Sequence, residues 1–137
     1  MNTYKEILSE AKTIAVVGCS DNPARTSNAI ARYLLGAGYR VIPVNPEHTE
    51  ILGETCYPST KAIPDDVHVD IVNIFRRPAH TADMVRDVLD RIARTGEKPV
   101  IWTQIGVSSN EAQELSESAG LLYVKNRCIM VEHARFT

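Results

Sequence analysis

The sequence predicts a single α/β domain, residues 1–137, in which a doubly wound parallel sheet of about five strands carries helices on both faces. Short apolar runs alternate with segments whose apolar residues recur at helical spacing, and this alternation is typical of strand–helix–strand units. The runs are apolar throughout, as expected for strands that are covered on both faces. A chain of 137 residues has the length of one domain, and no repeat or linker-like segment divides it.

The first part of the chain is expected to hold a short helix, a strand and a longer helix. Thr3 and Glu6 have the spacing of a capping box for a helix that runs to about residue 11. Residues 13–17 form the first apolar run, and a polar loop follows over residues 18–25. The next helix is expected to have Ser27 as its cap and to stop at Gly38, because glycine adopts the left-handed conformation of a helix end. The apolar stripe of this helix consists of Ala29, Ile30, Tyr33, Leu34 and Ala37.

The middle of the chain continues the alternation. The second strand is expected over residues 39–44, where Asn45-Pro46 stops it. Residues 47–66 are irregular, with room for one short turn or helix, and the third strand lies within residues 67–75. A second helical stripe then ends at Gly96; it consists of Met84, Val85, Val88, Leu89 and Ile92.

The last part of the chain contains the fourth strand, residues 99–102, and the fifth, residues 121–124. Ser109 is expected to cap the helix between them, which stops at Gly120, and a C-terminal piece spans residues 129–136. Right-handed crossovers leave few arrangements of five such strands, and the order 3-2-1-4-5 is predicted. The architecture is therefore Rossmann-like.

The composition excludes several classes of protein. Apolar residues make up 44% and charged residues 23% of the chain, which is typical of a globular protein rather than a disordered one. The formal net charge is −2, so a dedicated nucleic-acid binder is not expected. The sequence has neither an apolar run long enough for a membrane span nor a secretory signal, and a cytoplasmic location is expected.

The three cysteines, Cys19, Cys56 and Cys128, are widely spaced. Neither a disulfide framework nor a zinc site is expected from them, and no metal site is predicted.

A ligand is expected at the carboxyl ends of the strands, near the point where the strand order reverses. The loop after the first strand is suited to phosphate, because Gly18 permits close approach of the backbone while Ser20 and Asn22 offer donors. The helix near Ser27 would direct its amino-terminal amides at an anion, and Arg25 adds a cation. A polar surface loop is the alternative.

A dinucleotide site is disfavoured. The fingerprint Gly-x-Gly-x-x-Gly is absent, because Ser20 and Pro23 stand where the second and third glycines belong. The acidic residue that would bind a ribose is also missing, since Asn45 and Pro46 follow the second strand.

Two further positions have competing interpretations. There are three interpretations of the pair Arg76 and Arg77: they are solvated, they pair with Asp83 or Asp87, or they bind an anionic ligand. Trp102 is either part of the core or the wall of a slot for an apolar ligand arm.

Catalytic constellations are sparse. Cys19, beside a helix amino terminus, could be acidified and reactive, and no catalytic base is identified near it. No catalytic residue is therefore predicted.

Five strings along the chain resemble the CoA-binding domain family. The first two are Val17-Gly18-Cys19-Ser20-x-x-Pro23-x-Arg25-x-Ser27 and Gly38-Tyr39-x-Val41-Ile42-Pro43-Val44-Asn45-Pro46. The others are Phe75-Arg76-Arg77-Pro78, Trp102-x-Gln104-x-Gly106, and Arg127-Cys128 with Glu132-His133. The chain is similar to the CoA-binding first domain of the succinyl-CoA synthetase alpha subunit.

This resemblance implies that CoA lies across the carboxyl ends of the strands. The cofactor-binding residues expected from it and from the loops together are Gly18, Ser20, Asn22, Arg25, Ser27, Asn45, Pro46, Phe75, Arg76, Arg77, Pro78, Trp102, Gln104 and Gly106. The segment 125–133 departs from the family pattern, with Asn126 where an Asp is frequent and Met130 where a Lys is frequent.

The expected function is a non-catalytic protein that binds CoA or acyl-CoA, with no nucleic-acid or membrane partner. One alternative is a small CoA-dependent transferase or thiol-redox enzyme that uses Cys19 or Cys128. A regulator that senses an adenine nucleotide is the other.

Overall fold

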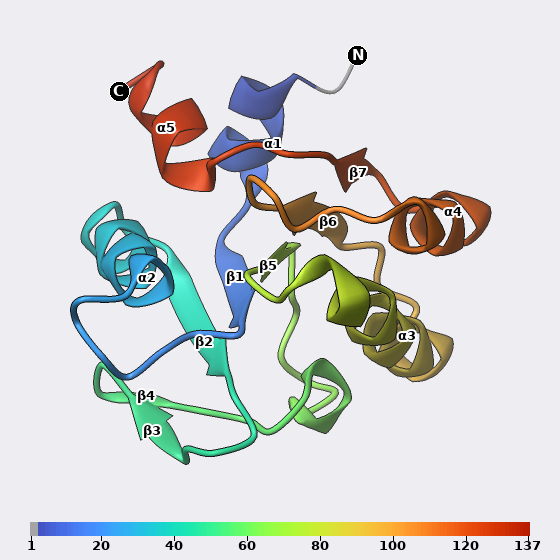
Figure 1. Ribbon diagram of the computed structural model, residues 1–137, viewed down its shortest axis with the longest axis horizontal. Coiled ribbons are helices and arrows are strands. Elements are labelled where there is room, and N and C mark those ends of the chain that lie inside the picture. Colours follow the sequence, from blue (N-terminus) through green and yellow to red (C-terminus); the bar gives the residue numbers. More distant parts are fainter. Residues whose placement is uncertain (1–2) are drawn as a thin grey trace.

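A five-stranded parallel sheet forms the centre of the protein, which a computed structural model describes over residues 3–137. The strands lie in the spatial order β2-β1-β5-β6-β7 (Figure 1). Their bounds are β1 Thr13–Val17, β2 Arg40–Val44, β5 Ile71–Ile74, β6 Val100–Thr103 and β7 Tyr123–Val124. The predicted α/β class and the parallel sheet are confirmed.

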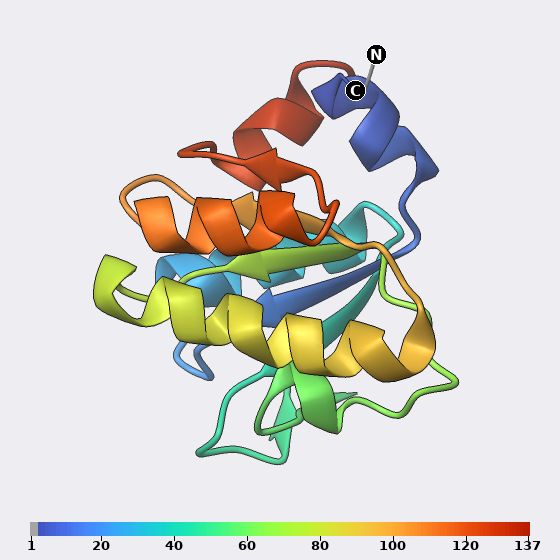
Figure 2. The same cartoon turned by 90° about the vertical axis from the view of Figure 1, so that its right-hand side faces the viewer.

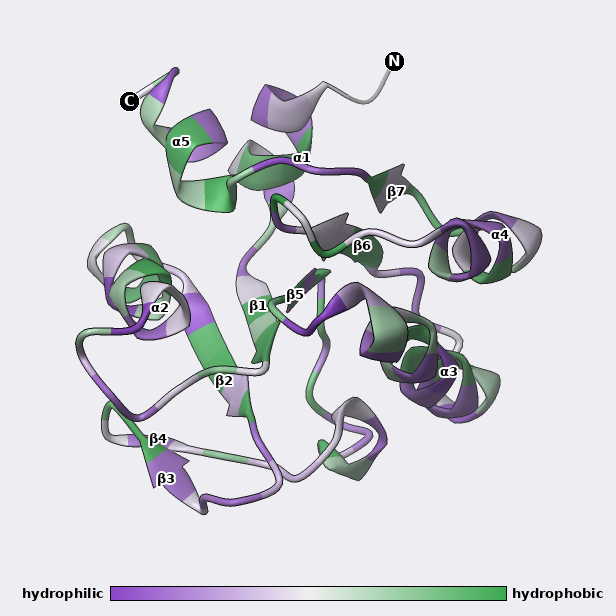
Figure 3. Cartoon of the chain, in the orientation of Figure 1, coloured by the Kyte–Doolittle hydropathy of each residue, from purple (hydrophilic) through white to green (hydrophobic). Residues whose placement is uncertain are grey.

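Helices cover both faces of the sheet, because alternate residues of each strand face opposite sides. Ile14 and Val16 of β1 pack with the helices on one face, whereas Ala15 and Val17 pack with those on the other. The first face carries α1 Tyr4–Glu10, α2 Thr26–Gly36 and α5 Ile129–Ala134. The second carries α3 Pro78–Thr95, α4 Asn110–Ser118 and the short 3-10 helix η1 Thr60–Ala62 (Figure 2). Figure 3 shows hydrophobic residues along β1 and β2, between these two helix layers.

The predicted 3-2-1-4-5 pattern is present once a single bridge is counted as the outer strand, and β7 then forms a sixth position. Tyr57 makes a parallel bridge to Val44 on the free edge of β2, after a small hairpin of β3 Glu50–Ile51 and β4 Glu54–Thr55. The strand expected within residues 67–75 is β5, and it pairs with β1 at the centre of the sheet rather than beyond β2. The irregular segment therefore supplies the outer position that the 67–75 strand was expected to occupy.

Most helix ends follow the local signals of the sequence. Thr3 and Glu6 form the predicted capping box, in which the Glu6 amide donates to Thr3 Oγ1 at 3.1 Å. Ser109 caps α4 by accepting a hydrogen bond from the Ala112 amide. The prediction that Ser27 caps α2 is wrong, because α2 starts at Thr26 and Ser27 lies inside the helix. The Ser27 hydroxyl instead accepts a hydrogen bond from the Ser20 amide at 2.9 Å.

A buried ion pair attaches the segment before β5 to α3. Arg91, 1% exposed, donates through Nε to Glu97 Oε1 at 2.8 Å, and also to the carbonyls of Ile63 and Val67. Glu97 in turn accepts the Val69 amide at 2.8 Å. The segment 63–69 has few regular backbone partners, so this pair replaces the hydrogen bonds that a strand would otherwise make. Across residues 3–137, the helices are too short or too polar to cross a membrane.

Candidate functional site

A groove lies at the carboxyl ends of β1, β2 and β5, where the parallel topology places a ligand site. This strand-end groove has a volume of about 560 Å³, and its lining residues come from the loops that follow the three strands. They are Gly18, Ser20, Asp21, Ala24, Arg25, Thr26, Ser27, Asn45, Glu47, His48 and Phe75. A smaller adjoining pocket of about 190 Å³ meets the groove at Gly18. Its walls are formed mainly by Val44, Pro46, Thr60, Arg76, Met84 and Asp87.

Gly18 forms the floor between the two cavities, and its conformation requires glycine. Its φ is +84°, in the left-handed region that residues with a side chain rarely adopt. A Cβ at this position would lie 3.1 Å from Cδ of Arg76 and 3.4 Å from the Phe75 carbonyl. The chain therefore passes closely between β1 and β5 at this point, and its backbone is open to a ligand.

The loop from Gly18 to α2 is held in place by its own polar side chains. Ser20 Oγ accepts the Asn22 amide at 3.0 Å, and Asn22 Oδ1 accepts the Ala24 amide at 2.9 Å. Asn28 donates to the Ser20 carbonyl at 2.9 Å. Asn22 thus shapes the loop without lining the groove.

The amino terminus of α2 faces the groove without a side-chain cap. Arg25 occupies the N-cap position and makes no capping hydrogen bond. Thr26 and Ser27, which start the helix, line the groove. The uncapped amides and the positive end of the helix dipole favour an anion here.

Asn45 connects the loops after β1 and β2. Its side-chain amide donates to the Cys19 carbonyl at 2.9 Å, and its oxygen accepts the Glu47 amide at 2.9 Å. His48 adds a second connection, with Nε2 lying 3.5 Å from Asp21 Oδ1. The two loops are therefore fixed relative to each other, so the groove is preformed.

The cations of this region differ in their surroundings. Arg25 lines the groove and Arg76 lines the adjoining pocket, whereas Arg77 is exposed and occupies the N-cap position of α3 without a capping hydrogen bond. Within residues 3–137, none of the three forms an ion pair. The proposed pairing with acids of α3 is wrong, since those acids have other partners. Asp83 binds Arg86 at 2.8 Å, and Asp87 Oδ1 lies 3.6 Å from Lys61 Nζ.

Desolvation at Asp87 raises the pKa of its carboxyl, and the nearby Lys61 opposes this shift. The adjoining pocket is thus lined by one half-buried acid, Asp87, and one cation, Arg76.

The residues predicted from β6 lie apart from the groove. Trp102 is fully buried and donates its indole N–H to the Arg127 carbonyl at 2.9 Å, so of its two interpretations the structure supports the core one. Gln104 Oε1 accepts the Ile129 amide at 2.9 Å, and the Gly106 amide donates to Asn126 Oδ1 at 2.7 Å. These contacts attach the segment 125–133 to the sheet. Pro78, at the start of α3, is exposed and likewise does not line either cavity.

Several lining residues were not predicted. Asp21, Glu47 and His48 belong to the loops that the topology selected, but nothing in their local pattern distinguished them. Thr60 and Met84 come from η1 and α3, and only packing against the sheet brings them beside Gly18.

The cysteines do not form a reactive centre in this groove. Cys19 is fully buried, and this burial raises the pKa of its thiol to about 12, with a smaller contribution from Cys56. The expectation of an acidified Cys19 is therefore wrong: the thiol faces the core rather than the helix amino terminus. Burial also raises the pKa of Cys56, and Cys128 is half-buried at the N-cap of α5. No cluster of metal-ligating side chains occurs in the described part of the chain.

A family model described as "CoA binding domain" matches residues 12–134. The chain belongs to this CoA-binding family. The uncharacterized protein YneT of Bacillus subtilis is 41% identical over 130 residues, which cover 95% of this chain and 91% of that protein. The structure of a hypothetical protein from Pyrococcus horikoshii OT3 superposes with a TM-score of 0.88 at 41% identity, covering 96% and 88% of the two chains.

Larger enzymes contain a related segment. An ADP-forming acetate–CoA ligase from Archaeoglobus fulgidus is 39% identical over 61 residues, which cover 44% of this chain and 9% of that enzyme. Small stand-alone relatives and large ligases thus share the family sequence. The ligases contain much more chain than the 137 residues present here.

Proposed function

We propose that this protein binds coenzyme A reversibly in the strand-end groove and its adjoining pocket, without forming a covalent bond to it. The proposal is carried by one combination of observations. The chain belongs to the CoA-binding family, and the uncapped amino terminus of α2 faces a groove whose floor is Gly18. CoA carries a pyrophosphate and a 3′-phosphate, and these are the groups that such a site favours.

The phosphates would lie against the loop from Gly18 to α2. The backbone at Gly18 allows close approach, and the first turn of α2 offers amide donors. Arg25 lines the groove and Arg76 lines the adjoining pocket, and neither forms an ion pair within residues 3–137. Charge-assisted hydrogen bonds from these guanidinium groups would hold the phosphates. The assignments of Ser20, Ser27, Asn45, Pro46 and Phe75 as neighbours of the ligand belong to the same proposal.

CoA is favoured over NAD by the residue that follows β2. A dinucleotide site places a free carboxylate there to bind the ribose hydroxyls. Here the position is Asn45, whose amide nitrogen and oxygen are both engaged by the neighbouring loops. This neutral amide, with one N–H and one oxygen lone pair already engaged, offers the ribose hydroxyls fewer acceptor sites than a free carboxylate does.

The burial of Cys19 and the raised pKa of its thiol support reversible rather than covalent binding of CoA. A thiol with a pKa of about 12 and no exposed surface is a poor nucleophile at neutral pH. Cys128 is the remaining candidate for thiol chemistry, because it is only half-buried. Its thiolate could attack CoA disulfide, form a mixed disulfide and release one CoA thiolate.

Isothermal titration calorimetry with CoA, acetyl-CoA, NAD and ADP tests the proposal. We expect CoA to bind more tightly than NAD and ADP, and acetyl-CoA to report whether an acyl group is tolerated. Equal or tighter binding of NAD would overturn the assignment. Intact mass spectrometry after incubation with CoA disulfide tests the covalent alternative, since an adduct at Cys128 contradicts a purely reversible role.

A further inference from the structure

A histidine lines the strand-end groove beside the loops that are expected to hold phosphate. This residue is His48, which lies in the loop after β2, and 31% of its side chain is exposed. Its Nε2 lies 3.5 Å from Oδ1 of Asp21, in the loop after β1. Because histidine changes its charge between pH 5 and 8, the charge of this groove depends on pH within that range.

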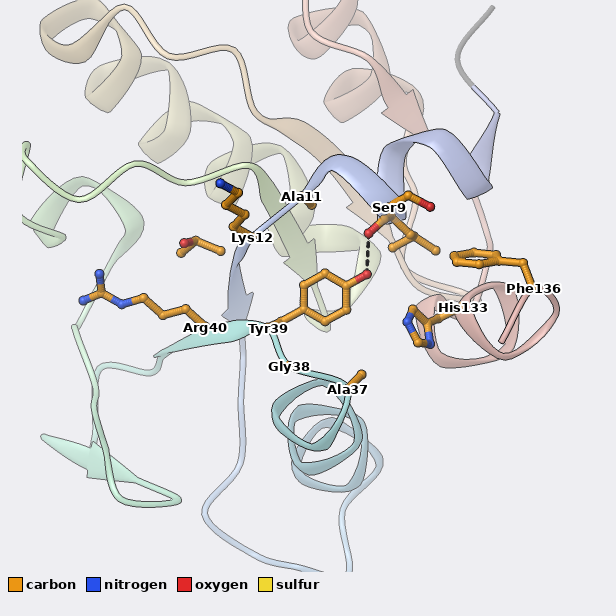
Figure 4. Close-up of a pocket in the computed structure, with 11 residues that line it drawn as sticks. Ser9, Ala11, Lys12, Ala37, Gly38, Tyr39, Arg40, His133 and Phe136 are labelled. Atoms are coloured by element: carbon orange, nitrogen blue, oxygen red, sulfur yellow. Dashed lines mark hydrogen bonds between the residues drawn. The ribbon is translucent and has the colours of Figure 1, made fainter.

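The other three histidines of the chain lie elsewhere. His68 precedes β5 and His80 belongs to the first turn of α3, and both are exposed. His133 is buried and lines a second pocket, of about 520 Å³, at the opposite end of the sheet, where β1 and β2 begin. Figure 4 shows it there beside Phe136, and their ring centroids are 5.3 Å apart. Among the histidines, only His48 therefore changes the charge of the strand-end groove.

The charges that line the groove give the pH dependence its sign. Arg25 supplies one cation, whereas Asp21 and Glu47 supply two carboxylates. With His48 neutral, these side chains have a net charge of −1, and a proton on His48 brings it to zero. The adjoining pocket adds one acid and one cation, which balance. The protonated groove is therefore the better site for a phosphate.

A protonated His48 has a donor to spare for a ligand. Protonated imidazole carries two N–H groups. Asp21 lies beside Nε2, while Nδ1 has no hydrogen-bond partner within residues 3–137. The ring can therefore keep its contact with Asp21, which connects the two loops, and still donate a charge-assisted hydrogen bond to a phosphate.

We propose that His48 makes the binding of CoA depend on pH, because its ring takes up a proton when a phosphate of CoA binds beside it. The inference rests on the proposed function, since it assigns a regulation to the same groove. The coupling is reciprocal: a phosphate beside the ring favours the protonated form, and the proton favours the bound ligand by the same factor. The contribution of His48 to CoA affinity should therefore grow as the pH falls from about 8 to about 5.5.

Calorimetric titration of the wild-type protein and His48→Gln with CoA, at about pH 5.5 and about pH 8, tests this coupling. A phosphate monoester such as the 3′-phosphate of CoA also changes its charge near pH 6, but this change is common to both proteins and cancels in the ratio of their dissociation constants. We expect the ratio of variant to wild type to be about three- to tenfold larger at the lower pH, because the contact is partly solvated. A ratio that is the same at both pH values would overturn the inference.

Two further variants separate the charge of His48 from other effects. His48→Lys keeps a cation at both pH values, so its affinity should exceed that of His48→Gln at both, and a gain confined to the lower pH would contradict the assignment. His80→Gln is the matched control, because His80 is an exposed histidine that lines neither cavity. It should keep the wild-type affinity at both pH values, and an effect equal to that of His48→Gln would contradict a role specific to the groove.

Dephospho-CoA identifies the phosphate that His48 contacts. If the ratio of His48→Gln to wild type still depends on pH with this ligand, the contact is to the pyrophosphate, and if it does not, the contact is to the 3′-phosphate. The outcomes also distinguish this inference from the proposed function. CoA binding with an unchanged ratio overturns only the role of His48, whereas no CoA binding by the wild-type protein at either pH overturns both.

Discussion

Replacing Gly18 by alanine tests whether the ligand approaches the backbone between β1 and β5. The substitution forces a residue with a side chain into φ +84°, which costs about 1–2 kcal/mol of folding free energy. The new Cβ would also lie 3.1 Å from Arg76 Cδ, a contact that the flexible arginine relieves by moving. We therefore expect Gly18→Ala to fold, with its melting temperature lowered by roughly 3–7 °C.

The effect on CoA affinity should exceed what backbone strain explains. A methyl group at Gly18 occupies the floor of the groove and displaces Arg76, so we expect at least about fivefold weaker binding, or roughly 1 kcal/mol. Gly53→Ala is the matched control, because Gly53 has a similar φ of +75° and lies in the β3–β4 turn, where a Cβ would meet no atom within 4 Å. It should lose a similar amount of stability and retain CoA affinity.

Urea denaturation measures the stability of both variants, and calorimetry measures their CoA affinity. If Gly18→Ala binds CoA as tightly as the unsubstituted protein, the ligand does not approach this glycine. If both variants lose affinity equally, loss of stability rather than local geometry is the cause.

Three further outcomes are expected. Arg76→Ala should weaken CoA binding by about 1–3 kcal/mol in calorimetry, whereas Arg77→Ala should have little effect, and equal losses would contradict the placement of the two side chains. Arg91→Met should destabilise the fold by about 3–5 kcal/mol in urea denaturation, because it removes the guanidinium partner of the buried Glu97 carboxylate and leaves only the exposed His68, 3.6 Å from Glu97 Oε2; a loss below about 1 kcal/mol would refute this. The folded pKa of Cys19 is raised, so its proton is bound more tightly in the folded state, and alkylation at about pH 8 followed by mass spectrometry should leave it unmodified.

The order of the elements could be predicted from the sequence because the signals are local. Apolar runs, the capping box at Thr3 and the cap at Ser109 act within a few residues, so they specify strands and helix ends without knowledge of the rest of the chain. The topology then placed the loops after β1 and β2 at one edge of the sheet. For the same reason the sequence alone predicts that Gly18 and Arg25 belong to the ligand site, and both line the groove.

The contacts between distant segments could be found only from the tertiary structure. Trp102 and Cys19 sit at the ends of strands, and only packing decides that both face the core rather than the ligand. The outer sheet position at Tyr57 comes from an irregular segment with no strand pattern. Tyr33 of α2 and His133 of α5 lie 100 positions apart in the sequence, yet Tyr33 Oη is 2.7 Å from His133 Nδ1. The side to which a side chain points depends on what covers each face of the sheet, and that is settled by non-local burial rather than by neighbours in sequence.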